Sequence, residues 1–390
     1  MPTRVLHFAW LFCLLCLAGC GGAPRASSAA PPATAPAVPA PPTPPAPSPA
    51  PAASTSQVFT QTNDATANTV LILNPAGDGS LSEAAAIPTG GEGSGGGLEN
   101  QGSLALNEDS SLLFVVNAGS NDFSVFRVSS TTLTLASRTP SGGLVPISVS
   151  EANGIVYVLN AGSRAGAADN ISGFKVAIDG TVTPIANSTR ALSAASTTPA
   201  QVSLNPGGTI ALVTERGTAT LDMFSIDANG LAGPTVSAPS SGTAPFGFQF
   251  LDATHVFISE EGTNGVSSYQ LNAGQIAPLT RSALNFQAGT CWLAIAPSGK
   301  FLYTTNTIAR TLSAYSIAPD GTTALVGSSG VAATASGPPI DATVSPDGKF
   351  LYLVDSGEGV DTFTIAANGA LTLLKNLTGI STTLNGIVAH

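Results

Sequence analysis

The sequence predicts an all-β fold, a seven-bladed β-propeller that is closed by its C-terminal strand. Three observations predict it: a short apolar run that ends at a polar residue recurs along the chain, its copies are evenly spaced, and the last residues resemble a strand that the first copy lacks. The seven copies of the run occupy residues 58–63, 112–117, 155–160, 210–215, 255–260, 301–306 and 350–355.

The spacing of these runs identifies the repeat. The polar residues that end them lie between 43 and 55 residues apart, as in 160 − 117 = 43 and 215 − 160 = 55. A repeat of about 40 to 50 residues that holds four strands is typical of propeller blades. Seven runs therefore predict seven blades.

The last full repeat shows the expected strands most clearly. Residues 340–345, 350–354, 360–365 and 370–374 are four short runs separated by turns, the first of which is Pro346-Asp347-Gly348. The second run is almost continuously apolar, which favours a strand buried on both faces, whereas the third alternates as a half-buried strand does. One such sheet has two open edges and cannot be stable alone.

The end of the chain predicts how the ring closes. Residues 384–390 resemble the opening strand of a repeat, and the first repeat, at residues 58–63, has no such strand before it. We expect the C-terminal strand to become the inner strand of the first blade. Closure of this kind removes the exposed strand edges of an open array.

The N-terminal residues predict export and a lipid anchor. A basic start, a ten-residue apolar run and the box Leu17-Ala18-Gly19-Cys20 resemble a bacterial lipoprotein signal. We expect a signal peptide at 1–19, a lipidated Cys20 followed by a disordered Pro/Ala-rich linker at 20–56, and the propeller at 57–390. Gly21 favours the outer membrane if the host has one. The alternatives are an ordinary cleaved signal with a chance cysteine, and a linker that is a proline-recognition ligand.

Composition limits the partners. Without the signal the chain loses Arg4, which leaves 12 basic and 23 acidic residues and a net charge of 12 − 23 = −11. This balance argues against nucleic acid and against electrostatic binding to anionic lipid, so we expect membrane contact only through the anchor. The domain holds one cysteine, Cys291, so it has no internal disulfide. We expect a monomer without cofactors.

Candidate site residues lie where the strand runs end and where the inner strands begin, because these positions share one face of a propeller. Glu215 and Glu260 replace the usual Asn or Asp with a longer carboxylate, and Arg216 follows the first of them. Such groups are suited to acid–base catalysis, with the arginine holding a carbonyl oxygen or an anion. Four further candidates for substrate binding are Phe246, Trp292, Asn306 and Asp341.

Other interpretations of these residues remain open. The polar residues that end the runs, such as Asn117, Asn160, Asn306 and Asp355, are suited to turns and their local hydrogen bonds, so their recurrence also favours a purely structural role. Their side-chain oxygens are of the type that binds Ca²⁺. No compact ligand motif is present, however, and we expect no metal. Phe246 and Trp292 are an apolar platform for a ring-shaped ligand or simply core residues.

Nucleophilic catalysis has little support. His255 begins a strand run, His390 is the last residue, and no histidine is placed to activate Cys291, which we expect to be a buried structural thiol. The glycine-rich run 90–97 lacks a following Gly-Lys-Ser/Thr, so we interpret it as a flexible connection and not a phosphate site.

The repeats SPDGKFLYLVD, PSGKFLYTTN and LNPGGTIALVTE resemble the lactonase-like seven-bladed propeller family, which includes 6-phosphogluconolactonases and carboxymuconate-cyclase-like proteins. The resemblance covers residues 58–390 and implies hydrolysis of a lactone or similar cyclic ester in the central channel. It implies Arg, His and acidic residues there; Glu215-Arg216 is the best match, and the histidine is missing or displaced. The alternative is a non-catalytic envelope scaffold that binds a glycan or protein on the same face.

Overall fold

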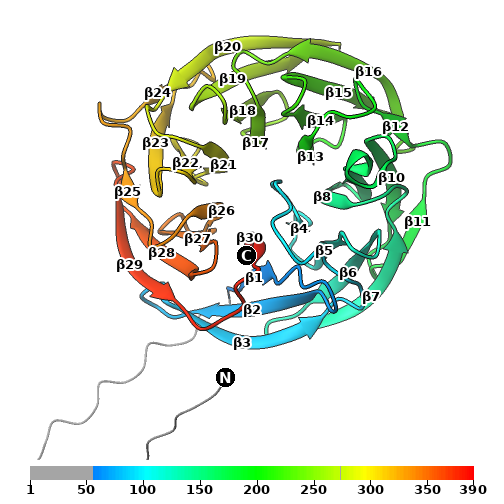
Figure 1. Cartoon of the computed structure of the whole chain (residues 1–390), viewed down its shortest axis with the longest axis horizontal. Helices are drawn as coiled ribbons and strands as arrows, with labels where there is room; N and C mark the ends of the chain where they lie inside the picture. Colours follow the sequence, from blue (N-terminus) through cyan, green and yellow to red (C-terminus); the bar gives the residue numbers. More distant parts are fainter. Residues whose placement is uncertain (1–55, 273) are drawn as a thin grey trace, which may run out of the picture. The chain divides into compact units, whose positions relative to one another are not determined.

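The computed structural model describes residues 56–272 and 274–390, so the expected signal peptide, Cys20 and most of the linker lie outside the described residues. The described chain forms seven antiparallel sheets arranged in a ring around a central channel (Figure 1). Its only helix within those ranges is a short 3₁₀ turn, η1 (Gly162–Ala165). No helix in the same ranges is long and apolar enough to cross a membrane.

Each sheet begins with an inner strand beside the channel and continues outward to the rim of the ring. The first three are β30 (Asn385–Ala389), β1 (Val58–Gln61), β2 (Thr69–Pro75), β3 (Leu81–Pro88); β4 (Leu104–Leu106), β5 (Leu112–Asn117), β6 (Asp122–Val128), β7 (Leu133–Pro140); and β8 (Pro146–Ala152), β9 (Ile155–Asn160), β10 (Asn170–Val176), β11 (Val182–Pro184), with β12 (Arg190–Ala191) also paired to β10.

The fourth and fifth sheets are β13 (Pro199–Leu204), β14 (Ile210–Glu215), β15 (Thr220–Ile226), β16 (Ala232–Pro239); and β17 (Pro245–Phe250), β18 (His255–Glu260), β19 (Gly265–Asn272), β20 (Gln275–Leu284). The sixth and seventh are β21 (Thr290–Ile295), β22 (Phe301–Asn306), β23 (Thr311–Ile317), β24 (Thr323–Leu325), with β25 (Ala333–Thr334) also paired to β23; and β26 (Pro339–Val344), β27 (Phe350–Asp355), β28 (Gly359–Ile365), β29 (Leu371–Leu377). We call these sheets blades 1 to 7.

The predicted ring closure is confirmed. β30 pairs with β1 antiparallel, in the register Val58↔Ala389, Phe59↔Val388 and Thr60↔Ile387. Two backbone hydrogen bonds between Gln57 and His390, of 3.1 and 3.0 Å, continue the pairing to the last residue. Blade 1 therefore takes its inner strand from the other end of the chain.

The hydrophobic core is distributed between neighbouring blades. At the closure seam Val58, Leu71 and Leu73 of blade 1 pack with Tyr352 and Val354 of blade 7, and all five are at least 96% buried. Since the seam is packed like the contacts between consecutive blades, the ring is held by burial of apolar surface all the way around.

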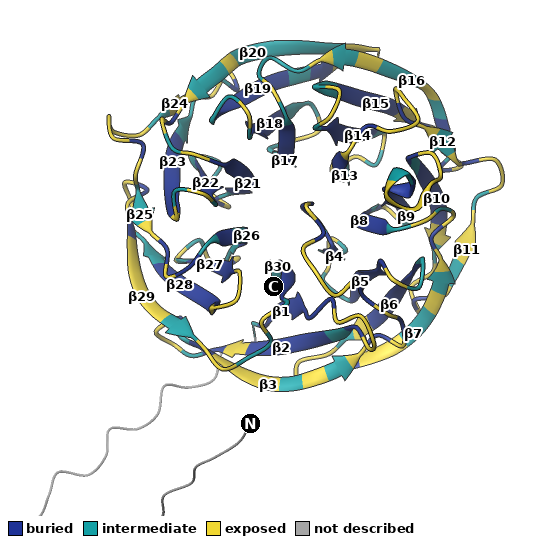
Figure 2. Ribbon diagram, viewed as in Figure 1, coloured by how far each residue is buried: buried dark blue, intermediate teal, exposed yellow. Residues whose placement is uncertain are grey.

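One prediction about burial is wrong. The alternation along β28 predicts a half-buried strand, but its residues 359–363 are all buried, because a neighbouring blade packs on each face of the sheet. Alternation of partly buried and exposed residues appears instead toward the ends of the outer strands β3 and β7, which face solvent on one side (Figure 2).

Candidate functional site

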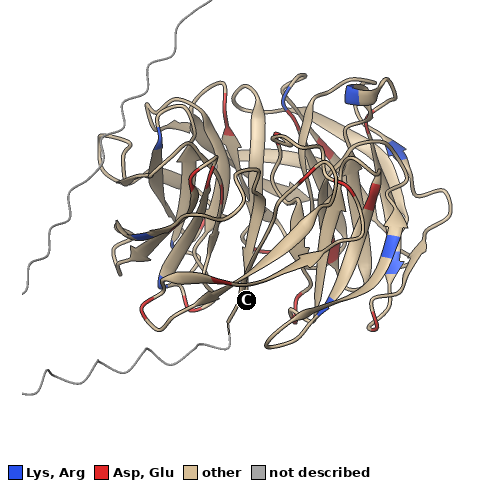
Figure 3. Ribbon diagram, turned by 60° about the horizontal axis from the view of Figure 1, so that its bottom comes forward, with Lys and Arg blue, Asp and Glu red and all other residues tan. Residues whose placement is uncertain are grey.

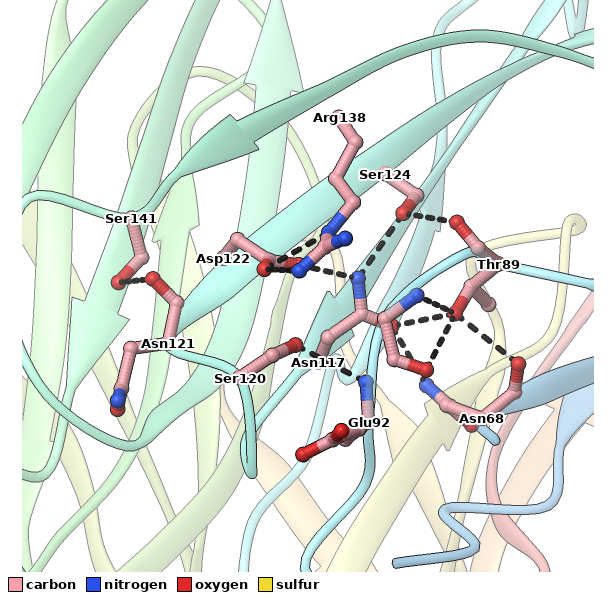
Figure 4. A network of polar contacts seen from close by, with 11 residues as sticks. Asn68, Thr89, Glu92, Asn117, Ser120, Asn121, Asp122, Ser124, Arg138 and Ser141 are labelled. Atoms are coloured by element: carbon pink, nitrogen blue, oxygen red, sulfur yellow. Dashed lines mark hydrogen bonds and ion pairs between the residues drawn. The ribbon is translucent and has the colours of Figure 1, made fainter. Parts of the chain in front are cut away.

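The polar residues that end the second strands lie between blades, and Asn117 shows the arrangement (Figure 4). Its Oδ1 accepts hydrogen bonds from Asn68 Nδ2 (2.9 Å) and Thr89 Oγ1 (2.7 Å) of blade 1. Its Nδ2 donates to Asp122 (2.7 Å) and Ser124 (2.9 Å) of its own blade. These hydrogen bonds link two blades. Asn117 is completely buried, so its side chain is not exposed to a ligand.

Asn306, which the sequence suggests as a substrate-binding residue, has the same environment as Asn117. Its Oδ1 accepts from Asn285 (2.9 Å) and Thr290 (3.0 Å), and its Nδ2 donates to Thr311 (3.1 Å) and Ser313 (2.9 Å). All the hydrogen-bonding capacity of the carboxamide is used inside the protein. These hydrogen bonds favour the structural interpretation of Asn306.

Glu215 occupies the equivalent position in blade 4. Its fully buried carboxylate accepts hydrogen bonds from the amide (3.0 Å) and the hydroxyl of Ser193, which follows β12 of blade 3. Asp222 on β15 lies next to it, and burial together with the hydrogen bond to Glu215 raises the pKa of Asp222 to about 7. Asp222 therefore keeps its proton up to about neutral pH inside the protein.

Glu260 is equally enclosed. It is fully buried, its Oε1 accepts a hydrogen bond from Ser240 Oγ (2.7 Å), and burial raises its pKa to about 7. Glu215 and Glu260 thus hold different blade interfaces, and neither carboxylate is accessible to a substrate. We do not assign them to a reaction, because a general base has to reach the proton that it removes.

A further carboxyl pair in blade 7 completes this set. Burial and the neighbouring Asp361 raise the pKa of Asp355 to about 8, while the Asp361 carboxylate accepts from the amide (2.8 Å) and hydroxyl (2.7 Å) of Ser336. These raised pKa values have a consequence for folding. The native protein keeps protons on Asp222, Glu260 and Asp355 that the unfolded chain has already lost at neutral pH.

Stability is therefore expected to fall as the pH rises from about 4, near the pKa of an unfolded aspartate, to about 8, through the folded pKa values of these groups. We expect a higher melting temperature at pH 5 than at pH 8, with each pair contributing on the order of 2 kcal/mol. Asp222→Asn and Asp355→Asn should flatten the profile, because an amide still donates a hydrogen bond but does not titrate. An unchanged slope in the double variant would show that Asp222 and Asp355 do not keep their protons in this way.

The central channel is blocked by the segment that follows the glycine-rich run 90–97. We call residues 98–102, in the connection between β3 and β4, the plug. Figure 1 shows the loop that leads into β4 reaching toward the middle of the ring. Gln101 Nε2 donates to Leu293 O of blade 6 (2.7 Å), Gln101 N donates to Ala200 O of blade 4 (3.1 Å), and Val149 N of blade 3 donates to Gly102 O (2.8 Å).

The plug is also fixed by side chains at its N-terminal end. Trp292 Nε1 donates to Asn100 O (2.6 Å), and Arg164, in the turn η1, donates to Leu98 O (2.7 Å). These bonds come from different sides of the ring, so the plug is a strut across the channel. It separates the channel into a pocket on each side.

The first pocket, which we call the mouth pocket, has a volume of about 450 Å³. It lies beside the plug on the face where the second strands end. Its lining combines apolar residues, hydroxyl groups, one carboxamide and one carboxylate: Gly96, Gly97, Glu99, Trp292, Thr307, Pro338, Ile340, Ser356, Thr382, Thr383, Leu384 and Asn385.

Glu99, on the wall of the mouth pocket, belongs to a charged group that lies beside the pocket. Arg216 contacts Glu99 (3.1 Å) and Glu261 (2.7 Å), and its guanidinium lies 4.9 Å from the centre of the Phe246 ring. Phe246 packs edge-to-face on Trp292 at 4.7 Å. Few residues on the blades are charged (Figure 3), so this group of three charged side chains is informative.

The predicted platform is only partly accessible. Phe246 is 99% buried beneath Arg216, so it supports the arginine and Trp292 and does not contact a ligand. Trp292 is 94% buried and contributes one edge to the mouth pocket. The remaining expected residue, Asp341, lies elsewhere.

Asp341 lines the second pocket, of about 360 Å³, which opens beyond the other side of the plug and includes Gln101, Gln201 and Ile387 in its wall. Burial raises the pKa of Asp341 well above its ordinary value, and its Oδ1 accepts from the Ala342 amide (2.8 Å). Asp341 and Trp292 therefore do not belong to one site.

The residues expected to be structural lie where that interpretation places them. His255 bonds to Asp252 (2.8 Å) at an outer loop, and His390 stacks on Phe59 at 5.5 Å beside the closure seam. Cys291 is buried, and burial raises the pKa of its thiol. Within the described ranges no three His, Cys, Asp or Glu side chains are grouped as metal ligands.

Sequence reasoning missed Glu99 and the plug, and it placed Glu261 on this face of the ring without giving it a role. Glu261 directly follows Glu260, and a doubled acid at the end of one run was the available signal. The plug was not predicted because it follows a glycine-rich run that resembles a flexible connection. The repeat pattern does not indicate which strands such a connection contacts.

The fold and site define a seven-bladed propeller with a plugged channel and a pocket at its mouth. Residues 258–383 match the family model described as Lactonase, 7-bladed beta-propeller. This match confirms the resemblance to lactonase-like seven-bladed propellers over those residues. No curated protein sequence matches it.

Solved structures support the fold. The chain is similar to a putative 6-phosphogluconolactonase from Bacteroides fragilis (TM-score 0.67, 17% identity, 86% of this chain and 98% of that one). It is similar to the periplasmic gluconolactonase PpgL of Pseudomonas aeruginosa (0.68, 17%, 86% and 98%) and to a protein from Lactobacillus plantarum (0.69, 16%, 86% and 99%). At these identities the similarity extends to the fold alone.

Proposed function

We propose that the protein hydrolyses a lactone or similar cyclic ester in the mouth pocket, with Glu99 as the general base. The observation that carries this proposal is the position of the Glu99 carboxylate. Its side chain is 59% exposed, it lies on the wall of a pocket large enough for a sugar ring, and Arg216 holds it by an ion pair. The family match and the relatives named as lactonases agree with this chemistry.

The reaction requires one proton acceptor. Glu99 takes a proton from water as the water oxygen attacks the ester carbonyl carbon. The tetrahedral intermediate then collapses, the ring C–O bond breaks, and Glu99 returns the proton to the departing alkoxide, which yields a hydroxy acid. Arg216 acts on Glu99 by orienting its carboxylate, and Glu261 fixes Arg216 from the other side.

The test is turnover by the purified protein across a panel of sugar and aromatic lactones, measured above the spontaneous rate. A second candidate function is non-catalytic binding of a glycan at the same mouth. It is favoured by the absence of a nucleophile–base pair among the described residues that line the pocket. Failure to hydrolyse any member of the panel would select this second function.

We also propose that the protein acts outside the cytoplasm and is attached to the cell envelope through Cys20. The support is the agreement between the basic start, the apolar run and the Leu17-Ala18-Gly19-Cys20 box. Cys20→Ser is expected to release the protein from the membrane fraction, whereas Cys291→Ser should leave its location unchanged. A Cys20→Ser protein that still sediments with membranes would contradict the anchor.

A further inference from the structure

The chemistry of the mouth pocket indicates what kind of ring it accepts. None of the described residues that line it is Lys, Arg or His. Binding a phosphate group normally requires such cations, above all arginine, whose planar guanidinium matches the phosphate oxygens. The pocket wall offers one carboxylate, that of Glu99, which would repel an anion.

The nearest cations are already engaged. Arg216 donates to Glu261 through Nε (2.9 Å) and pairs with Glu99 through Nη1 (3.1 Å). Arg164 donates to Leu98 O in the plug (2.7 Å). A phosphorylated ligand would therefore meet negative charge without a free cation to offset it.

One polar atom of the pocket lacks a partner. Asn385 is 97% buried at the start of β30, lines the mouth pocket, and its Oδ1 accepts no hydrogen bond from any described residue. A buried acceptor without a donor costs about 1 to 3 kcal/mol, which a ligand hydroxyl would recover. Around it are the hydroxyl groups of Thr382 and Thr383 and the edge of Trp292.

We infer that the mouth pocket takes an uncharged, hydroxylated ring, an unphosphorylated sugar lactone, with one ligand hydroxyl donating to Asn385 Oδ1 and the ring contacting Trp292. This inference rests on the proposed function and adds the substrate class to it. Among the described residues that line the pocket, Glu99 is then the one charged side chain, and it lies where water is activated.

The experiment compares gluconolactone with its 6-phosphate on the full-length protein. It measures kcat/KM after subtraction of the spontaneous hydrolysis, and it measures binding by calorimetry with free glucose and with glucose 6-phosphate, which are stable rings. We expect kcat/KM for the unphosphorylated lactone to be at least ~100-fold higher, because the phosphate brings two charges into an acidic pocket. Equal or faster hydrolysis of the phosphate would overturn the inference and leave the proposed function standing.

Two pairs of variants separate the remaining outcomes. Asn385→Ala should weaken binding of the sugar ring by roughly tenfold, since one hydrogen bond is lost, whereas Asn376→Ala removes another unpartnered amide outside the pocket and should not. Thr382→Arg places a cation in the pocket. It should raise the ratio of kcat/KM for the 6-phosphate to kcat/KM for the unphosphorylated lactone by roughly tenfold. Thr372→Arg, on the outer strand β29, is its control.

Glucose binding that depends on Asn385, without any turnover, would support the substrate class and overturn hydrolysis. No binding of any of these compounds would overturn both. An Asn385→Ala protein that fails to fold does not end the test, because the Thr382→Arg ratio is measured independently at an exposed position.

Discussion

Removal of residues 385–390 is expected to unfold the propeller. These residues include β30, the inner strand of blade 1, and their loss exposes the hydrogen-bonding edge of β1 and opens the packed seam against blade 7. Loss of Ile387, which is 96% buried, costs about 1.5 to 3 kcal/mol, and each lost backbone hydrogen bond costs about 1 kcal/mol more. The sum is comparable to the whole stability of a typical domain, about 5 to 15 kcal/mol.

The measurement is thermal unfolding of a fragment 56–390 and of its truncated form 56–384. A circular permutant is the matched control, because Gln57 and His390 already pair at the seam and a short linker can join them. In that permutant β30 and β1 become a hairpin, and we expect it to melt as the parent does. A truncated fragment that still melts cooperatively within a few degrees of the parent would contradict the closure.

Glu99→Gln is expected to lower kcat for lactone hydrolysis by about 10² to 10³, the contribution typical of a general base. The amide keeps the size of the side chain and does not accept the proton. The melting temperature should change little, since the Glu99 side chain is 59% exposed and such an ion pair is worth about 0 to 1 kcal/mol.

The control for this variant is Glu92→Gln. Glu92 is an exposed acid in the same connection between β3 and β4, and it does not line the mouth pocket. It should retain the activity of the parent. If Glu99→Gln keeps full kcat, or if Glu92→Gln loses as much, Glu99 is not the base.

The strands were predictable because each blade repeats the same pattern of apolar strand residues and polar turn residues. Most of the second strands begin and end as expected, for example Ile210–Glu215 and His255–Glu260, since an apolar run flanked by turn residues records burial on both faces. The pairing of β30 with β1 at the seam was also predictable, because the first repeat lacked an inner strand and the C-terminal residues resembled one. The first run was less accurate, since β1 ends at Gln61 and not at Asn63.

The site was harder to predict because it depends on contacts between segments far apart in the sequence. Glu99 faces Arg216 only because the plug crosses the ring, and the sequence pattern around Glu99 is that of an ordinary glycine-rich connection. Glu215 and Glu260 were assigned to catalysis because a carboxylate is unusual among the residues that end these runs. The structure shows that each reaches a serine of the preceding blade, Ser193 and Ser240 respectively.

We expect the Glu99 carboxylate, at the mouth of the channel, to act in catalysis, and the Glu215 and Glu260 carboxylates, at the strand ends, to stabilise the fold. The most direct measurement is kcat and melting temperature for Glu99→Gln beside Glu260→Gln, on the same lactone and at the same pH. We expect Glu99→Gln to lose kcat and keep its melting temperature, and Glu260→Gln to keep kcat per folded molecule while its melting temperature becomes less dependent on pH. The reverse pattern, with kcat lost in Glu260→Gln and retained in Glu99→Gln, would show that Glu99 is not the general base.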